Sequence, residues 1–257
     1  MGQSLGKQKN ANVLSPHPGI PLAISGDYEK FVLLPEFNIS AVDAQHNTVL
    51  HGLFTTAKAN DGHKKILRHI ATFFEGSEGG GTLIETLQSE NDLGCGVLWI
   101  GVAYQSIALL DELKELVGAE FIKALVQVPN KQGDTGILAA CSRGGEESLK
   151  WLNFLFEGDG DGLAKLLGRS NKNGTDIVQT AVSGRHADTL KILVKIMRKE
   201  RFGEANGAGL YPLHVAAERD CKEVAEILLG VVGTEGTRVT DKVRQEERRE
   251  GGEKGGE

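Results

Sequence analysis

Two histidines stand in similar settings and are the first candidates for chemistry. His214 lies two residues after Pro212, where an apolar helical pattern begins, and His51 lies three residues after Thr48. An imidazole is a common metal ligand and a common proton carrier at physiological pH. A metal site needs further ligands, and no set of His, Cys, Asp and Glu residues recurs here at ligand spacing. We therefore predict that neither histidine binds a metal ion or takes part in catalysis.

Two glycine-rich segments share only part of the pattern of ligand-binding loops. The segment GSEGGGT (Gly76 to Thr82) lacks the Lys-Ser/Thr ending and the preceding apolar strand of a phosphate-binding loop. The segment GDGDGL (Gly158 to Leu163) offers Asp159 and Asp161 but lacks three residues that a calcium loop requires. We interpret the first segment as a flexible insertion and the second as the end of a helix. With no other catalytic motif standing out, the sequence predicts no catalytic residue, no metal and no cofactor.

The composition is that of an ordinary soluble globular protein. The chain has 257 residues, of which 40% are hydrophobic and 25% charged, and its formal net charge is −6, which does not favour nucleic acid as a partner. Cys95, Cys141 and Cys221 lie too far apart for a metal knuckle or a dense disulfide framework, which indicates a reducing compartment. No apolar run approaches the roughly 18 residues of a membrane span, and the polar start does not resemble a secretory signal. We therefore expect a cytoplasmic protein.

One residue pattern recurs along most of the chain. It runs from a glycine through an apolar pair and a small pair to a second apolar stripe, and it is clearest in YPLHVAAERDCKEVAEILL (Tyr211 to Leu229). The corresponding apolar positions are separated by 48, 39, 41 and 35 residues, and they are Leu50, Leu98, Ile137, Val178 and Leu213. Before the first full copy, residues 21–43 match the back half of the same unit. Such a period indicates stacked units that bury their apolar stripes against one another.

This pattern resembles the ankyrin repeat, whose signature is close to D-x-x-G-x-T-P-L-H-x-A-A-x-x-G-H-x-x-I-V-x-x-L-L. The last copy matches nearly every signature position, whereas the copy around Trp99 has lost both the Thr and the His. All separations exceed the usual period of about 33 residues, and the two glycine-rich segments account for two of the excesses. The resemblance implies an all-α solenoid of stacked antiparallel helix pairs, with inter-repeat loops or hairpins and long insertions.

The resemblance also divides the chain into three parts. We expect a flexible leader over residues 1–17 and a repeat domain over residues 18–232. This domain would hold a partial N-terminal repeat and about five further repeats. Residues 233–257 mix both signs of charge densely and end in glycines, so we expect a mostly disordered tail.

Several residue types at the turns have a physical explanation in this fold. Thr48 and Thr135 can bond to backbone groups where a helix begins, and Pro212 fits a first turn that needs no amide donor. We expect His51 and His214 to bond through their ring nitrogens to backbone groups and so tie one repeat to the next. Glycine permits a positive φ angle at a loop tip, as expected at Gly133, Gly174 and Gly209. Small pairs let neighbouring helices approach closely, namely Ala139-Ala140 and Ala216-Ala217.

The resemblance implies that the partner is another protein. Family members usually make contacts through loop tips and through the exposed ends of first helices. In this chain those positions are Gln132, Asp134, Arg143, Lys172, Arg185, Asn206, Leu210 and Arg219. Their charge varies from copy to copy while the buried positions repeat, as expected if they specify a partner. We therefore expect a monomeric, non-enzymatic interaction scaffold or adaptor.

Two other functions stay open at this point. Met1-Gly2, followed by polar residues and nearby lysines, is similar to an N-myristoylation signal, although Gly6 stands where Ser or Thr is usual. Acylation of Gly2 would make the protein a membrane-peripheral regulator, and without it the leader is simply unmodified. NTVLHGLF (Asn47 to Phe54) looks like repeats in the cytosolic parts of certain channels, which suggests a regulatory subunit of a channel-like or signalling assembly.

Overall fold

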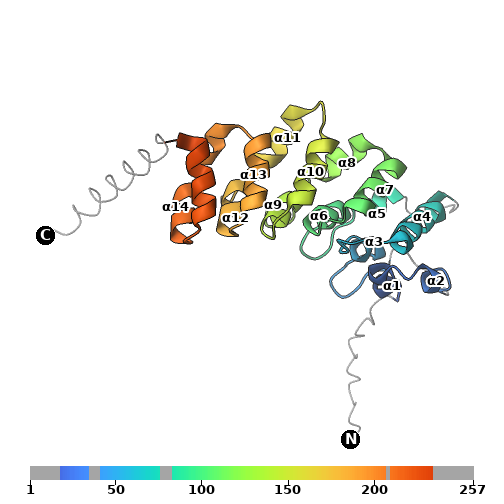
Figure 1. The fold of residues 1–257 in the computed structure, drawn as a ribbon. Helices are drawn as coiled ribbons and strands as arrows, with labels where there is room; N and C mark the ends of the chain where they lie inside the picture. The colour runs from blue at the N-terminus through green and yellow to red at the C-terminus, as the bar shows by residue number, and fades with distance from the viewer. Residues whose placement is uncertain (1–17, 35–40, 76–82, 207–208, 234–257) are drawn as a thin grey trace, which may run out of the picture.

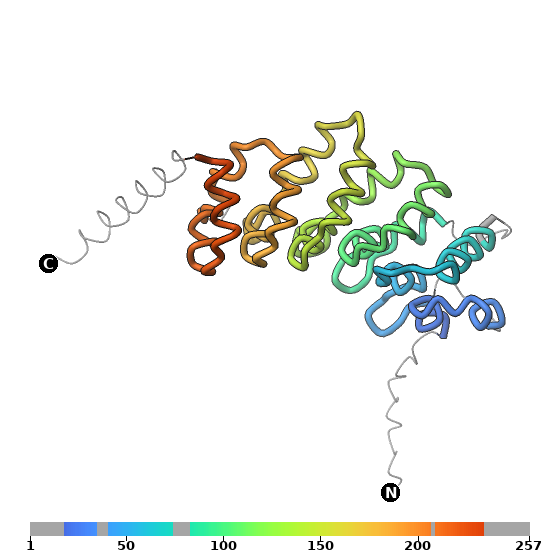
Figure 2. The backbone as a smooth tube through the Cα atoms, viewed as in Figure 1, coloured from blue at the N-terminus to red at the C-terminus, as the bar shows by residue number. Residues whose placement is uncertain are grey.

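The described part of the chain is an elongated, curved stack of short helices (Figure 1). The computed structural model describes residues 18–34, 41–75, 83–206 and 209–233. Within them, six helix pairs each have an inner and an outer helix, and each repeat lies beside the next in chain order (Figure 2). The pairs are α1 (Gly19–Ser25) with α2 (Tyr28–Phe31), α3 (Val49–Leu53) with α4 (Asp61–Glu75), α6 (Val97–Ala103) with α7 (Ile107–Val117), α9 (Gly136–Cys141) with α10 (Glu146–Leu155), α12 (Ile177–Ser183) with α13 (Ala187–Ile196), and α14 (Pro212–Glu218) with the helix over residues 222–233.

Inner helices pack on inner helices and outer helices on outer helices along the stack. The described residues contain no β-strand and only one isolated bridge, between Glu90 and Gly96. The predicted all-α solenoid of stacked helix pairs is therefore confirmed.

From α4 onward, a short connecting helix lies between each outer helix and the next inner helix. They are α5 (Leu83–Gln88), α8 (Ala119–Leu125), α11 (Gly160–Leu167) and the 3-10 helix η1 (Lys199–Gly203). These added turns explain why the repeats are longer than about 33 residues. The prediction that the segment from Gly158 to Leu163 ends a helix was wrong. It begins α11, because the Asp159 carboxylate accepts the Gly162 N–H at 2.9 Å as an N-cap. The insert over residues 76–82 lies outside the described residues.

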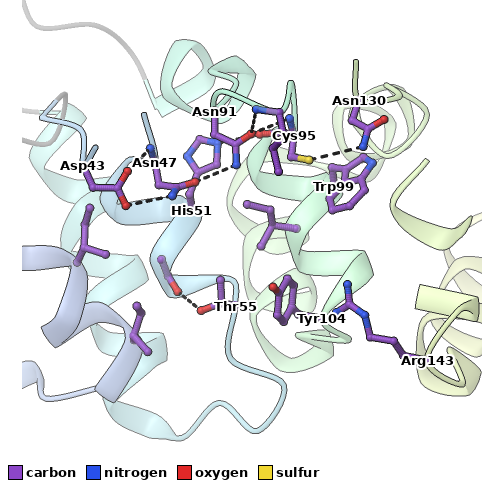
Figure 3. Close-up of a pocket in the computed structure, with 15 residues that line it drawn as sticks. Asp43, Asn47, His51, Thr55, Asn91, Cys95, Trp99, Tyr104, Asn130 and Arg143 are labelled. Atoms are coloured by element: carbon purple, nitrogen blue, oxygen red, sulfur yellow. Dashed lines mark hydrogen bonds between the residues drawn. The ribbon is translucent and has the colours of Figure 1, made fainter. Parts of the chain in front are cut away.

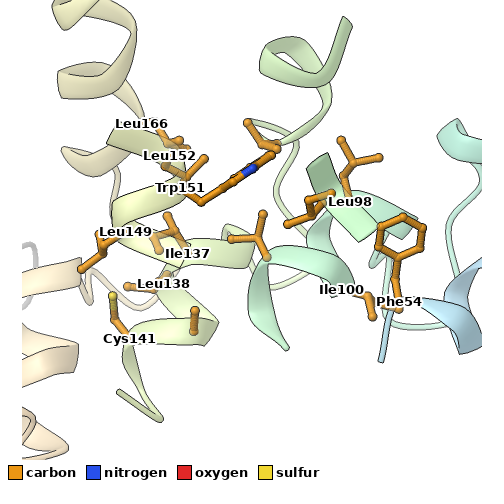
Figure 4. Packing of buried hydrophobic residues seen from close by; sticks show 14 of the residues in the cluster. Phe54, Leu98, Ile100, Ile137, Leu138, Cys141, Leu149, Trp151, Leu152 and Leu166 are labelled. Carbon is orange, nitrogen blue, oxygen red and sulfur yellow. The ribbon is translucent and has the colours of Figure 1, made fainter. Parts of the chain in front are cut away.

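Apolar side chains from all six pairs join into one core. Figure 4 shows part of this core, with Leu98, Ile137, Leu149 and Leu152 packed between neighbouring repeats. The sixth residue of each inner-helix motif, counted from the N-cap, is small and buried in four successive repeats, namely Gly101, Ala140, Ala181 and Ala216. Only one residue of each predicted small pair is buried, because Ala139 is half-buried and Ala217 is exposed. Close approach of the helices therefore depends on a single small position per repeat.

A five-residue turn precedes each inner helix from α3 onward. Its first residue is Asp or Asn, and the side-chain oxygen accepts the backbone N–H four positions later in all five turns. In the first four turns the same oxygen also accepts the N–H two positions later. The fourth residue has a positive φ angle at His46, Gly94, Gly133, Gly174 and Gly209, which confirms the prediction for the last three. The turns begin at Asp43, Asn91, Asn130, Asn171 and Asn206.

Successive turns are bonded to one another and form what we call the turn ladder. Three inter-turn backbone bonds join Asp92 N to Gln45 O at 3.1 Å, Lys131 N to Leu93 O at 3.1 Å, and Lys172 N to Gln132 O at 3.0 Å. The Asn91 amide donates to the Asn47 side chain at 2.9 Å, and the Asn171 amide donates to the Asp134 carboxylate at 2.8 Å. The ladder therefore uses both the backbone and the side chains of the same turns.

A second set of bonds ties the inner helices α3, α6 and α12 to the next turn. His51 Nε2 lies 3.1 Å from the Cys95 carbonyl oxygen, and Trp99 Nε1 donates to the Asp134 carbonyl at 2.7 Å. Gln179 Nε2 donates to the Leu210 carbonyl in the same way. The copy that has lost the histidine therefore keeps the tie through the Trp99 indole.

His214 does not make the tie that the sequence predicts. Its Nε2 atom is buried and has no hydrogen-bond partner among the residues that the structure describes, which include no five-residue turn after the one that begins at Asn206. The other predicted turn residues occupy helix starts. Thr48 and Thr135 precede α3 and α9, where their side chains accept a backbone N–H, and Pro212 is the first residue of α14.

Substitution of a glycine between two inner helices would test how closely these helices must pack. A Cβ atom on Gly136 would lie 2.6 Å from the Trp99 carbonyl oxygen, whereas Gly160, in the first turn of α11, has open space. Since the atoms that Gly136 meets are backbone, we expect Gly136→Ala to lower the free energy of unfolding by about 1–3 kcal/mol. Gly160→Ala should leave it unchanged or raise it slightly. Urea denaturation measures both, and equal effects would contradict this packing.

The buried His51 ring gives a pH test. Thr48 donates its backbone N–H to Nδ1 at 3.1 Å, so the proton of the neutral ring lies on Nε2, facing Cys95. Burial lowers the pKa of His51, although the Cys95 carbonyl and Asp43 raise it. The unfolded chain therefore takes up this proton more readily, and stability falls as the pH drops below about 6.5.

We expect His51→Gln, which keeps a donor like that of Gln179, to be less sensitive to acid than the wild type. As the pH falls below about 6.5, the wild type should lose more stability per pH unit than the variant, with a limiting difference of about 1.4 kcal/mol per pH unit. Denaturation curves at several pH values measure the two slopes. Equal slopes would show that His51 does not titrate as its burial requires.

Candidate functional site

A groove of about 350 Å³ lies between the inner helices α1, α3 and α6 and the turns that precede α3 and α6 (Figure 3). We call it the inner groove. Its apolar surface comes from Ile20, Ile24, Leu93, Ile100 and the half-buried Trp99 ring. Trp99 is held in place by its bond to Asp134, so its orientation is set by the next repeat. The groove is thus apolar and fixed by the same bonds that hold the stack together.

An aromatic side chain and a cation form one end of the inner groove. Tyr104 follows α6 and is 40% exposed, and the Arg143 guanidinium carbon lies 4.9 Å from the centre of its ring. This distance is that of a cation–π contact. Gln105 links the two turns, since its amide donates to the Gly144 carbonyl at 3.3 Å and its oxygen accepts the Glu147 N–H at 3.2 Å. The pair therefore spans two repeats that are locked together.

The charge of Arg143 is not neutralised by its neighbours. Among the described residues no ion pair involves Arg143, and the adjacent acids are engaged elsewhere. Glu147 pairs with Lys150 at 2.6 Å, and Glu146 accepts the Thr189 hydroxyl at 3.0 Å. A guanidinium presents several donors in a planar fork, so Arg143 offers an unfilled binding position to a ligand.

The opposite end of the inner groove is acidic but already saturated. Asp43 lies far from Arg143 in Figure 3, and its carboxylate accepts the Gln45 N–H, the Asn47 N–H and the Asn47 amide at 2.8–3.0 Å. Burial raises the pKa of Asp43, but the bonds from Asn47 and Gln45 outweigh it and lower the pKa overall. The groove therefore has a fixed negative end and an available positive end.

The described residues provide neither a metal-binding cluster nor a reactive thiol at this site. In the described ranges no group of three or more His, Cys, Asp and Glu residues is placed to hold a metal ion. Burial raises the pKa of the Cys95 and Cys141 thiols, which keeps both in the less reactive protonated form at neutral pH. No helix in the described part of the chain is long and apolar enough to cross a membrane.

The predicted contact residues fall into two rows. Gln132, Asp134 and Lys172 lie in the turn ladder, where Asp134 is bonded to Asn171 and Gln132 to Lys172. Asn206 and Leu210 begin and end the last turn, and Leu210 is exposed. Arg143, Arg185 and Arg219 lie at the turns between inner and outer helices, and all three are exposed. Gly2 lies outside the described residues.

Sequence reasoning missed the aromatic half of the site. Tyr104 and Trp99 belong to the copy that matches the repeat signature least, so the signature did not predict a role for either residue. A signal was available in the spacing, because Tyr104 and Arg143 each follow the first residue of their turns by 13 positions, counted from Asn91 and Asn130. Equivalent positions in adjacent repeats lie side by side, so this spacing could have paired them.

Comparisons with known proteins agree with this architecture. Residues 208–233 match a family model described as ankyrin repeat. The chain is 29% identical over 121 residues to ankyrin repeat-containing protein ITN1 of Arabidopsis thaliana, which covers 42% of this chain and 20% of that protein. The chain therefore spans about a fifth of the length of this curated relative.

Solved structures show the same fold at low sequence identity. The ankyrin repeat domain of Bcl-3 has a TM-score of 0.60 at 15% identity and covers 85% of this chain and 87% of that chain. A chain from the complex of the Bdellovibrio bacteriovorus endopeptidase Bd0816 with immunity protein Bd3460 has a TM-score of 0.59 at 17% identity, with 83% and 98% covered. The ankyrin repeat protein EF0377 has a TM-score of 0.52 at 15% identity.

The family match, the curated relative and the stacked helix pairs all lead to one assignment. The repeats depart from the usual pattern in two ways, namely the added connecting helices and the replacement of His by Trp99 or Gln179. Neither departure interrupts the packing of one repeat on the next. The chain has the fold of an ankyrin-repeat stack with divergent repeats of variable length, and its residues 208–233 match the ankyrin-repeat family model.

Proposed function

We propose that this protein is a non-enzymatic scaffold or adaptor that binds another protein in the inner groove. Ankyrin repeats generally mediate protein–protein interaction and are typically non-enzymatic. A stack in which each repeat touches only its neighbours offers a long, curved surface, which suits contact with another polypeptide.

The observation that carries this proposal is the exposed Tyr104–Arg143 pair beside Trp99. Tryptophan, tyrosine and arginine are the residue types that contribute most often to the energy of protein interfaces. Each of the three is held by the fold rather than free, through the Asp134 carbonyl, the end of α6 and the Tyr104 ring respectively. A partner would therefore find these side chains already ordered, which lowers the entropy lost on binding.

Affinity capture with mass spectrometry tests the proposal through matched variants. We expect Tyr104→Ala combined with Arg143→Ala to reduce recovery of at least one partner by tenfold or more, since hot-spot residues contribute about 2 kcal/mol or more each. Lys165→Ala, an exposed change on the connecting helix α11, should retain the same partners as the wild type.

The melting temperature of each variant serves as the control. Since Tyr104 and Arg143 are exposed, their loss should leave it nearly unchanged. Equal recovery of every partner by the wild type and the double variant would contradict a binding role for the inner groove.

A further inference from the structure

The inner groove has one charged position that is open to a ligand, and this bears on the chemistry of the partner. At one end, Asp43 is surrounded by three donors and has little capacity left for another. At the other end, Arg143 has neither an ion pair nor a side-chain hydrogen bond within the described ranges. An anionic group is therefore attracted to the Arg143 end and repelled from the Asp43 end, which also sets the direction in which a ligand lies.

The guanidinium of Arg143 is held in an orientation suited to binding a planar anion. The Tyr104 ring supports the guanidinium, and the Gln105 bridge fixes the distance between the two turns. An arginine with restricted motion loses less entropy when it forms the two parallel bonds that a carboxylate accepts. The apolar wall made by Ile24, Ile100 and the Trp99 ring begins beside this position, so a ligand would need an apolar group close to its anionic one.

The next repeat provides a second cation in the same row. Arg185 lies at the turn between α12 and α13, is exposed, and has a φ angle of 60°. Its acidic neighbour Asp188 pairs with Lys191 at 3.0 Å, and no ion pair of Arg185 is present in the described part of the chain. Packed helices lie about 8–10 Å apart, and an extended peptide rises about 3.3 Å per residue. One repeat therefore corresponds to roughly three residues of an extended partner.

We propose that the partner segment is an extended acidic peptide. A large apolar side chain enters the inner groove beside Trp99, and a neighbouring Asp or Glu carboxylate binds the Arg143 guanidinium. A second acidic residue, roughly three positions further along, faces Arg185. This inference rests on the proposed function, because it names the chemistry of the partner for the same groove.

A random dodecapeptide display library panned on the purified full chain tests this chemistry. On the wild type we expect enrichment of sequences with Asp or Glu next to a large apolar residue, and with a second acidic residue about three positions later. On Arg143→Glu the preference at the first acidic position should be lost or reversed to Lys or Arg. Lys165→Glu, an exposed change on the connecting helix α11, should give the wild-type preference and controls for the change of net charge.

Synthetic peptides of the enriched sequence then give the coupling between the two groups. Replacing the first acidic residue by its amide should weaken binding to the wild type about tenfold or more in fluorescence anisotropy, and should have little effect on binding to Arg143→Gln. Enriched peptides that need Tyr104 but show no acidic preference would overturn this inference and leave the proposed function standing. Failure to enrich any peptide sensitive to Tyr104→Ala would count against both.

Discussion

The hydrogen bonds between successive turns are the interaction on which the rest of this structure depends. From α3 onward, each inner helix begins after a turn whose first Asp or Asn holds it in shape, and each turn from Asn91 to Asn171 is bonded to the turn before it. Backbone groups in these turns have no partner within a helix, so leaving buried ones unpaired would be costly. The turn ladder gives several of them partners and at the same time fixes the spacing between repeats.

Because the spacing between repeats is fixed, exposed residues from neighbouring repeats are held close enough together to form a binding site. The tie from Trp99 to Asp134 and the bridge made by Gln105 cross from one repeat to the next, so Tyr104 and Arg143 meet although 39 positions separate them. Neither residue is needed for the core, since both lie at the surface. The stack thus separates two requirements, because buried positions maintain the fold while exposed positions are free to determine what is bound.

The sequence predicted the parts of the fold that depend on local chemistry. Helix pairs follow from the apolar periodicity, and positive φ angles at Gly133, Gly174 and Gly209 follow from the position of glycine in the repeat. The Asp or Asn that begins each turn was also readable, because Asp43, Asn91, Asn130, Asn171 and Asn206 recur at the same separations as the apolar positions.

Contacts across repeats were harder to predict. The Trp99 indole donates the hydrogen bond that a histidine makes elsewhere, although the two side chains differ in shape. The stacking of Arg143 on Tyr104 can be predicted only if the alignment of the two repeats is known. The local sequence pattern around His214 does not show which residues lie beside its ring. It therefore could not predict that His214 Nε2 lacks a hydrogen-bond partner among the described residues.

A crystal structure of this protein with a captured partner tests the central claim most directly. That claim is that the bonded stack presents an ordered groove to another polypeptide. The account predicts a partner segment lying along the inner helices, in contact with Tyr104, Arg143 and Trp99, with these side chains oriented as they are here. A partner seated on the outer helices, with the inner groove empty, would contradict it.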